Sequence, residues 1–233
     1  MTKEVCAFIF ARGGSKGVPR KNLREAGGRT LLDRSIDVAL EIPRVAGVFV
    51  STDDDDIASG AKKRGVGVIP RGPELSGDDS PEWLAWQHAI TSVRDMGFKC
   101  DVLLSIPPTA PLRTPEDVQR CLDALVDKID CVVTMTPSAH HPAFNMVSLD
   151  SEGSLRLGMS ETPTIQRRQD APPMFSLTTV AYAARSDFVL QSSRMWQGVV
   201  RGIEVPVERA LDVDSEWDLH VADLVLRERQ NHV

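Results

Sequence analysis

Short apolar runs alternate with amphipathic stretches over the first 137 residues of the chain. Nearly continuous runs of Val, Ile, Leu and Phe predict β-strands at residues 5–10, 46–51, 66–70, 101–106 and 130–136. Between them, apolar residues at helical spacing predict helices at 30–41, 54–64, 80–97 and 115–127. Strands that are apolar on both faces are typical of a parallel sheet covered by helices on each side. The alternation therefore predicts an α/β fold with a Rossmann-like, doubly wound and mostly parallel sheet.

The regular pattern is interrupted between residues 138 and 178. This stretch is rich in proline and polar residues and has only short alternating runs, such as 144–149. A regular pattern returns in two apolar runs, 180–184 and 199–205, and in an amphipathic helix at 215–229. We expect one domain over 1–233, with 138–178 as a small projecting extension. Its apolar residues favour contact with a second copy of the chain, and a local lid is the alternative.

The overall composition is that of an ordinary globular protein, with 42% hydrophobic residues and a net charge of −6. An acidic chain does not favour general nucleic-acid binding, so we expect small-molecule partners. We expect no membrane span and no signal peptide, because the required apolar runs are missing. The four cysteines have no CxxC spacing, which favours buried, reduced thiols and a cytoplasmic location.

The loop after the first predicted strand is basic and rich in glycine, although the chain is acidic. It reads Ala11-Arg12-Gly13-Gly14-Ser15-Lys16-Gly17-Val18-Pro19-Arg20-Lys21-Asn22. Glycines allow successive backbone N–H groups to converge on an anion, and the four cationic side chains add formal charge. Neither the Walker A pattern nor the GxGxxG dinucleotide pattern is present. We therefore interpret the loop as a binding site for a nucleoside triphosphate.

Acidic residues occur at two further places where a crevice is expected in an open parallel sheet. Asp212 and Asp214 follow a short apolar run, and alternation places both carboxylates on one side of an extended backbone. Together with triphosphate oxygens they are ligands that Mg²⁺ accepts; capping of the following helix is an alternative role. The acidic run 53–56 is interpreted as a helix start, with Asp53 as the N-cap.

The order of motifs resembles that of the acylneuraminate cytidylyltransferases, the CMP-sialic acid synthetase family. Besides the loop 11–22, the matching segments are Ser51-Thr52-Asp53, Arg71-Gly72-Pro73-Glu74-Leu75, Pro108-Thr109-Ala110-Pro111-Leu112-Arg113, Arg168-Gln169-Asp170 and Leu211-Asp212-Val213-Asp214. The resemblance implies CTP as donor, a divalent cation such as Mg²⁺, transfer of CMP with release of pyrophosphate, and a homodimer.

The resemblance also implies roles for individual residues. Arg12 and Lys21 would be catalytic, because they would hold the triphosphate and offset charge on the transferring phosphorus. The implied nucleotide-binding residues are Ala11, Arg12, Gly13, Gly14, Ser15, Lys21, Asn22 and Arg71. The implied metal ligands are Asp212 and Asp214. For an acidic acceptor the expected binding residues are Arg113, Arg167, Arg168 and Gln169, since guanidinium groups suit carboxylates and phosphonates alike.

Two segments depart from the family pattern on the acceptor side. Pro107 stands where the family usually has a glutamine that faces the sugar, and Thr178-Thr179 stands in place of an Asn-Gly pair. The acceptor is therefore expected to be an acylneuraminate or a related 3-deoxy sugar acid, with a small phosphonate as the alternative. A nucleotidyltransferase with another base or acceptor, and a non-catalytic nucleotide-binding module, are the other hypotheses.

Overall fold

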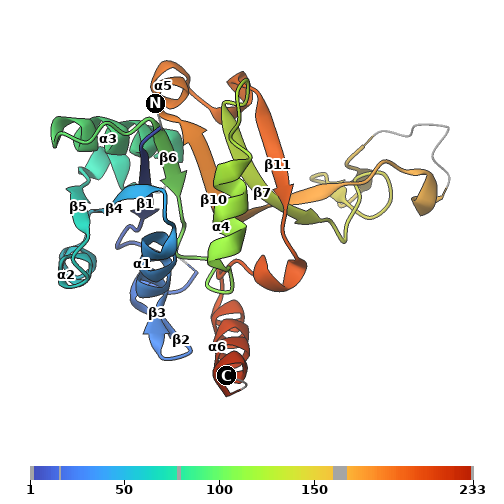
Figure 1. Ribbon diagram of the computed structural model, residues 1–233. Helices are drawn as coiled ribbons and strands as arrows, with labels where there is room; N and C mark the ends of the chain where they lie inside the picture. Colours follow the sequence, from blue (N-terminus) through green and yellow to red (C-terminus); the bar gives the residue numbers. More distant parts are fainter. Residues whose placement is uncertain (1–2, 16, 78–79, 160–166, 232–233) are drawn as a thin grey trace.

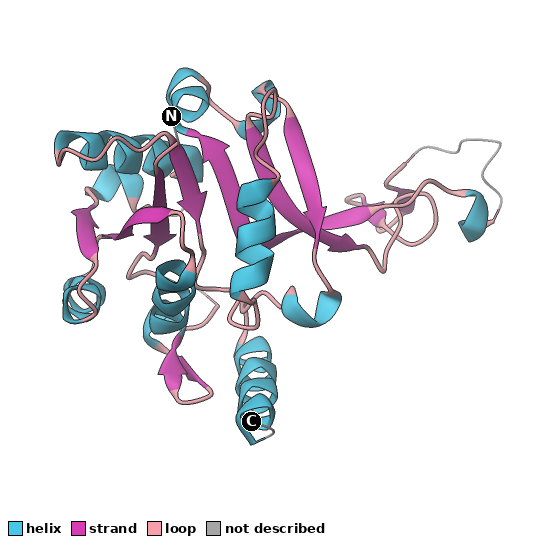
Figure 2. Cartoon of the chain, viewed as in Figure 1, coloured by secondary structure: helices cyan, strands magenta, loops and turns pink. Residues whose placement is uncertain are grey.

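A computed structural model describes residues 3–15, 17–77, 80–159 and 167–231. Its centre is a seven-stranded sheet with the order β11-β7-β10-β6-β1-β4-β5. These strands are β1 (Val5–Phe10), β4 (Val45–Thr52), β5 (Gly67–Pro70), β6 (Val102–Ser105), β7 (Cys131–Pro137), β10 (Phe175–Arg185) and β11 (Val200–Glu204). Figures 1 and 2 show the twisted sheet with helices on both sides. The prediction of a doubly wound, mostly parallel α/β fold is confirmed.

Helices cover both faces of the sheet. One face carries α1 (Leu31–Glu41), α2 (Asp55–Lys63) and α4 (Pro115–Asp123); the other carries α3 (Glu82–Asp95) and α5 (Ser186–Gln191). The central strand β1 serves both: Val5, Ala7 and Ile9 join the first core, and Cys6 and Phe8 join the second. Alternation along the strand requires this division, because successive side chains point to opposite faces. All five are fully buried, which fixes the loop that follows β1.

The strand β10 runs against the others. It pairs antiparallel with β6 and with β7, whereas β1 pairs parallel with β4 and β6, and β11 pairs parallel with β7. It begins at Phe175, earlier than the apolar run 180–184 predicts. Its first three residues pair with β7 but are exposed, and burial starts at Thr178, so the apolar pattern identified only the buried part of the strand.

The extension predicted at 138–178 contains a small hairpin, β8 (Val147–Leu149) and β9 (Leu155–Leu157). In Figure 1 it projects at the right, beyond β7 and the start of β10. All six hairpin residues are exposed, and Leu149 and Leu155 have exposed fractions of 69% and 65%. The expected projecting shape is thus observed for the described part of this segment.

The C-terminal helix α6 (Glu216–Asn231) packs on a second small hairpin, β2 (Glu25–Ala26) and β3 (Arg29–Thr30). Its apolar residues Leu219, Ala222 and Leu226 form a separate cluster with Ala26 and Val213. Over the residues that the structure describes, five short 3₁₀ turns accompany these elements: η1 (Lys21–Leu23), η2 (Pro73–Leu75), η3 (Arg168–Asp170), η4 (Met195–Gln197) and η5 (Val207–Arg209). Packing of α6 on the hairpin brings residue 213 back beside the first loop, although about 190 positions separate them in the chain.

The cysteines are free and buried, as the sequence predicts. Over the described residues, none of the helices combines the length and the apolar character that crossing a membrane requires.

Candidate active site

Two adjacent cavities open where β1 ends. The first, of about 330 Å³, is called here the loop cavity; its lining residues are Phe10, Arg12, Ser15, Gly17, Lys21, Asn22, Pro107, Pro108, Thr109 and Asp214. The second, also of about 330 Å³, is called the Arg71 cavity; it is lined by Phe10, Arg12, Arg71, Leu75, Gly77, Ser80, Glu82 and Ala85. Since Phe10 and Arg12 line both, one extended ligand can occupy the two cavities together.

Two glycines of the first loop are required by close approach. A Cβ on Gly13 would lie 2.7 Å from an Oδ2 atom of Asp54, and a Cβ on Gly17 would collide with the backbone oxygen of Asp214. Gly14 has open space around its Cβ position. The loop is therefore clamped between the start of α2 and the segment before α6, while its middle is free to face a ligand.

The acidic run 53–56 has two separate tasks. Asp54 caps α2, because its carboxylate accepts hydrogen bonds from the N–H groups of Asp56 and Ile57. The prediction that Asp53 is the N-cap is wrong: its Oδ1 accepts a hydrogen bond of 2.9 Å from the backbone N of Gly13. Asp53 thereby anchors the first loop to the end of β4, a role that a run of four similar acids does not reveal.

The cations of the loop are not equivalent. Arg20 forms ion pairs with Asp56 (2.7 Å) and Asp54 (3.4 Å), so it belongs to the junction with α2 and does not line the loop cavity. Arg12 and Lys21 line the cavity, and an Nη1 of Arg12 donates to the carbonyl oxygen of Gly77 at 3.3 Å. Lys16 lies outside the described residues. The structure thus brings together the two cations for which the resemblance implies a catalytic role.

Lys21 joins the first loop to the segment before α6. Its Nζ donates to the carbonyl oxygen of Val213 at 2.7 Å and forms an ion pair of 3.0 Å with Asp214. Asn22 closes the same loop, since its Nδ2 donates to the carbonyl oxygen of Arg12 at 2.9 Å and only 6% of the residue is exposed. The ammonium group is thus held at the cavity wall by two fixed acceptors, and little rearrangement is needed to present it to an anion.

Asp212 is partly buried and, unlike Asp214, is not among the residues that line the loop cavity. Burial raises its pKa, and so does the charge of Asp214, whereas hydrogen bonds from Thr109 and Thr179 and the charge of Lys21 lower it. One carboxylate oxygen, Oδ1, is buried and has no hydrogen-bond partner. A buried carboxylate oxygen without a donor fits a cation, because an unpaired buried charge is costly. The described residues hold no cluster of three or more His, Cys, Asp or Glu side chains suited to a metal, so phosphate oxygens would have to complete such a site.

The Arg71 cavity brings Arg71, which was expected at the nucleotide, into one lining with Glu82, an acid that sequence reasoning missed. Burial lowers the pKa of Arg71, and the charges of Asp53 and Glu82 oppose this effect. Burial raises the pKa of Glu82, whose Oε1 accepts a hydrogen bond of 3.2 Å from the indole of Trp86. The Nε of Arg71 is buried without a partner. The cavity wall therefore includes a donor, Arg71, and an acceptor, Glu82, and both are needed to read the edge of a planar polar ring.

The structure corrects the expected place of Arg113. Only 6% of the residue is exposed, and its guanidinium donates to Ser35 Oγ (2.9 Å) and to the carbonyl oxygens of Pro107 and Thr179. Burial lowers its pKa to about 9. Arg113 thus lies beneath the loop that lines the loop cavity and supports this loop, and its guanidinium is not among the cavity's lining groups.

The other residues expected at the acceptor lie on the extension. Arg167 forms an ion pair of 2.8 Å with Asp170 and is exposed, and the backbone of residues 168–170 forms the turn η3. Neither Arg167 nor Gln169 lines the loop cavity within the described chain. The side chain of Arg168 lies outside what the structure describes. Within one chain, the structure does not bring these residues to the first loop.

A glycine-rich, cationic loop follows the first strand of this doubly wound sheet and shares its cavity with Asp214, an arrangement suited to binding a nucleoside triphosphate. The chain belongs to the cytidylyltransferase family, whose sequence model matches residues 6–140. It is therefore an enzyme that takes its cytidylyl group from CTP. The resemblance read from the motifs is confirmed at the level of the family.

Individual relatives agree with this assignment. The chain is 28% identical over 231 residues to post-translational flagellin modification protein B of Campylobacter coli, which covers 97% of this chain and 96% of that protein. It is 28% identical to CMP-N,N'-diacetyllegionaminic acid synthase of Campylobacter jejuni, over 96% of this chain and 95% of that protein. Against N-acylneuraminate cytidylyltransferase of Streptococcus agalactiae serotype V the identity is also 28%, and the chain spans 56% of that longer protein.

A solved structure shares the fold. CMP:2-keto-3-deoxy-manno-octonic acid synthetase in complex with CTP aligns with a TM-score of 0.71 at 18% identity, covering 98% of this chain and all of that chain.

Proposed function

We propose that this enzyme transfers CMP from CTP to an anomeric hydroxyl of a nine-carbon or related 3-deoxy sugar acid and releases pyrophosphate. The observation that carries the proposal is the loop cavity itself, a space of about 330 Å³ that Arg12, Lys21 and Asp214 all line. The relatives named for sialic and legionaminic acids support a sugar acid as acceptor.

The donor fits the two cavities in one orientation. The triphosphate would lie in the loop cavity, where the backbone of residues 13–15 and the cations Arg12 and Lys21 offset its charge. The base would enter the Arg71 cavity, where Arg71 can donate to the ring carbonyl of cytosine. Glu82 can accept from the exocyclic amino group, which uracil lacks. This pairing supports a preference for CTP over UTP.

The chemical step needs little from the protein beyond placement and fixed charge. The acceptor oxygen attacks the α-phosphorus, its proton is lost to solvent or a nearby base, and the bond to the pyrophosphate oxygen breaks. Lys21 is positioned by the Val213 carbonyl and by Asp214, so its charge is already in place when negative charge develops.

We further propose that Asp212 and Asp214 hold Mg²⁺ together with oxygens of the triphosphate. The unpartnered Oδ1 of Asp212 supports this assignment. When bound, the ion would stabilise charge on the phosphate oxygens. Thr109 and Thr179 position the Asp212 carboxylate, and Arg113 donates to the carbonyl oxygens of Pro107 and Thr179 in the same two segments.

The extension supports a homodimer. Its hairpin exposes Leu149 and Leu155, and Arg167 lies outside the loop cavity of its own chain. In a dimer the extension would reach the partner's loop cavity, and Arg167, Arg168 and Gln169 would bind the acceptor carboxylate there. The buried thiols are compatible with a reducing, cytoplasmic location.

A phosphonate acceptor is the second candidate, and the observation that favours it is Pro107. This residue lines the cavity without an amide side chain, where recognition of many sugar hydroxyls would leave groups unpaired. The two acceptors differ in chemistry, because a hydroxyl must lose a proton on attack whereas a phosphonate oxygen is already anionic. Rates for a phosphonate should therefore vary little above pH 7.

One experiment tests the proposal. The purified protein is incubated with each of the four nucleoside triphosphates, Mg²⁺ and a panel of sialic, legionaminic and 3-deoxy-octulosonic acids and small phosphonates, and pyrophosphate is measured. Release only with CTP and a sugar acid supports the proposal. Release with CTP and only a phosphonate selects the second candidate, and release with another nucleotide would contradict both. The variant Lys21→Met, checked for folding, controls for contaminating activity.

A further inference from the structure

A third cavity lies on the far side of the loop 107–113, behind the active site. It has a volume of about 230 Å³ and its lining residues are Arg29, Arg34, Asp37, Val38, Glu41, Ala110, Pro111, Arg113, Leu226 and Arg229. Four guanidinium groups and two carboxylates thus surround one small space in a chain with a net charge of −6. We call it the arginine cavity.

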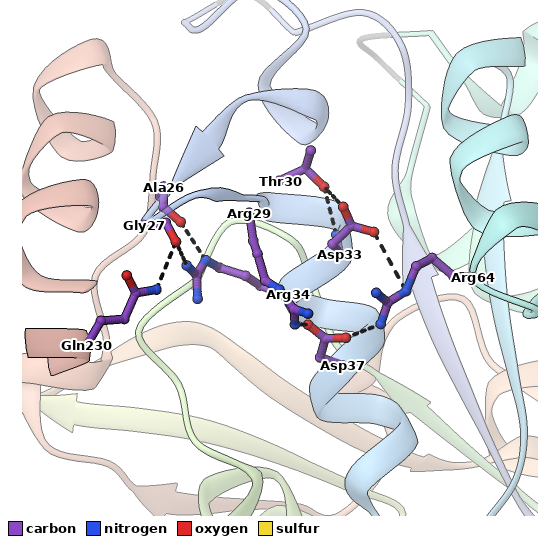
Figure 3. Close-up of polar contacts among 9 residues, drawn as sticks. All are labelled: Ala26, Gly27, Arg29, Thr30, Asp33, Arg34, Asp37, Arg64 and Gln230. Carbon is purple, nitrogen blue, oxygen red and sulfur yellow. Dashed lines mark hydrogen bonds and ion pairs between the residues drawn. The ribbon is translucent and has the colours of Figure 1, made fainter. Parts of the chain in front are cut away.

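The charge in this cavity is not balanced by its own acids. Asp37 is already paired twice, with Arg29 from the β2–β3 hairpin and with Arg64 from the end of α2 (Figure 3). Within the described chain, no carboxylate forms an ion pair with Arg34, Arg113 or Arg229. Of the two acids in the described lining, Asp37 forms ion pairs with arginines and Glu41 does not. Four guanidinium groups therefore face two carboxylates, and the lining has excess positive charge.

The arginines are held in place by backbone carbonyls rather than by acids. Arg34 donates through Nε to the carbonyl oxygen of Ala26 (2.7 Å) and through Nη2 to that of Gly27 (2.9 Å), as Figure 3 shows. Arg229 donates to the carbonyl oxygen of Leu112 at 3.1 Å. A guanidinium has five N–H donors, so each group keeps donors for a ligand. Burial lowers the pKa of Arg34 and the nearby charge of Arg29 lowers it further, whereas the charges of Asp37 and Asp223 oppose this effect.

Arg113 supplies a second, independent indication of a ligand. Arg113 lines the cavity, and only 6% of the residue is exposed. Its Nε is buried and has no hydrogen-bond partner. A buried cationic donor left unpaired is costly, and a bound anion would remove that cost. Arginine forks match the oxygens of phosphate-type anions.

From these observations we propose that the arginine cavity binds a small oxyanion of the phosphate class, with Arg29, Arg34 and Arg229 as ligands at its mouth and Arg113 at its base. The site is separate from the nucleotide loop. Ala110, Pro111 and Arg113 line the arginine cavity, whereas Pro107, Pro108 and Thr109 line the loop cavity. One short loop therefore separates the two cavities, and the Arg113 guanidinium donates a hydrogen bond to the carbonyl oxygen of Pro107 in this loop. An anion at the arginine cavity restrains the wall of the active site.

The test is a calorimetric titration of the whole protein with inorganic phosphate, without Mg²⁺ and at constant ionic strength, with chloride as reference. Arg29→Gln/Arg229→Gln removes two exposed ligands, and each lost charged contact weakens binding by about tenfold or more. Arg44→Gln is the matched control, because Arg44 is an equally exposed arginine paired with Asp123 outside the cavity. We expect saturable phosphate binding that the double variant weakens at least about tenfold and that Arg44→Gln leaves unchanged.

Phosphate bound at the nucleotide loop is distinguished by Lys21→Met. Binding that Lys21→Met abolishes and the double variant leaves intact would overturn the proposal, as would a titration that chloride reproduces. A second measurement does not depend on folding of the variants. Hydrogen exchange of the wild-type peptide spanning 107–113 should slow on addition of phosphate, and an unchanged rate would contradict the link through Arg113. Neither result depends on which acceptor the enzyme uses.

Discussion

Lys21 gives the most direct test of how this active site works, through the substitution Lys21→Met. The Lys21 side chain is only 15% exposed; methionine keeps its apolar part and removes the ammonium group. Because that group is fixed by the Val213 carbonyl and Asp214, its loss removes a charge that is in place before the reaction begins. Loss of one such group lowers kcat by about 10²–10³-fold, or about 2.7–4 kcal/mol in the barrier.

The same structure predicts a much smaller effect on stability. Asp214 has an exposed side chain (76%), so its ion pair with Lys21 contributes at most about 1 kcal/mol. The hydrogen bond to Val213 adds about 0.5–1.5 kcal/mol. We therefore expect unfolding to be easier by about 1–2 kcal/mol, which lowers Tm by roughly 2–8 °C for a chain of this size. The protein should remain folded at assay temperature, and the rate loss can be read as a property of the site.

The matched control is Arg20→Met, which removes the same charge from the adjacent residue. Arg20 is half-exposed, pairs with Asp54 and Asp56, and lies outside the cavity lining. Pyrophosphate release at saturating CTP should fall by less than about threefold in this variant, in line with the small effect of surface ion pairs. The reasoning is refuted if folded Lys21→Met turns over within about threefold of wild type, or if Arg20→Met loses as much as Lys21→Met.

Three further outcomes follow from other parts of the structure. Arg209→Gln should destabilise the fold by about 3–5 kcal/mol in urea unfolding, because Asp117 is completely buried and bonded twice to Arg209 (2.7 and 2.8 Å). Burial raises the pKa of Asp117 but its bonds to Arg209 outweigh this and lower it, so the stabilisation is present above the ordinary aspartate pKa and is lost as pH falls through the lowered value. A wild-type-to-variant gap that does not narrow at all as the pH falls below the ordinary aspartate pKa would contradict this. EDTA should abolish turnover, and Asp212→Asn should weaken the dependence on Mg²⁺; full activity in EDTA would exclude the proposed metal. Leu155→Glu, on the exposed hairpin, should shift the mass measured by light scattering from dimer to monomer, whereas an unchanged mass would remove the hairpin from the interface.

Much of the central sheet is readable from the chain because its strands are buried on both faces. The strand Val5–Phe10 coincides with the predicted run, since its residues alternate between two cores and every one must be apolar. β10 shows the limit of this rule. Its first three residues are exposed, so they need not be apolar and the sequence pattern does not reveal them. Its antiparallel direction depends on the extension that precedes it.

The active site divides in the same way. The local order of residues 11–22 is sufficient to indicate a polyphosphate loop, because glycine and cations act there within a few residues of one another. Which carboxylate holds that loop is a tertiary property: Asp53 and Asp54 are neighbours of the same type, and only packing of β1 against β4 assigns one to Gly13 and the other to α2.

Arg113 and its surroundings illustrate what the linear order does not contain. In the sequence Arg113 is a cation near a strand end and could bind a substrate. In the fold it is buried and donates hydrogen bonds to Ser35 and to backbone carbonyl oxygens. Its neighbours in the arginine cavity come from residues 29–41 and from residues 226 and 229, which meet only because α6 packs against the first hairpin. The chain alone therefore indicated the sheet and the donor loop through short-range patterns of burial and charge, and the class of reaction through the resemblance of its ordered motifs to a family. Only the tertiary structure decided which charged groups face the substrate, which support its loop, and which gather behind it, because those roles depend on contacts between segments distant in sequence.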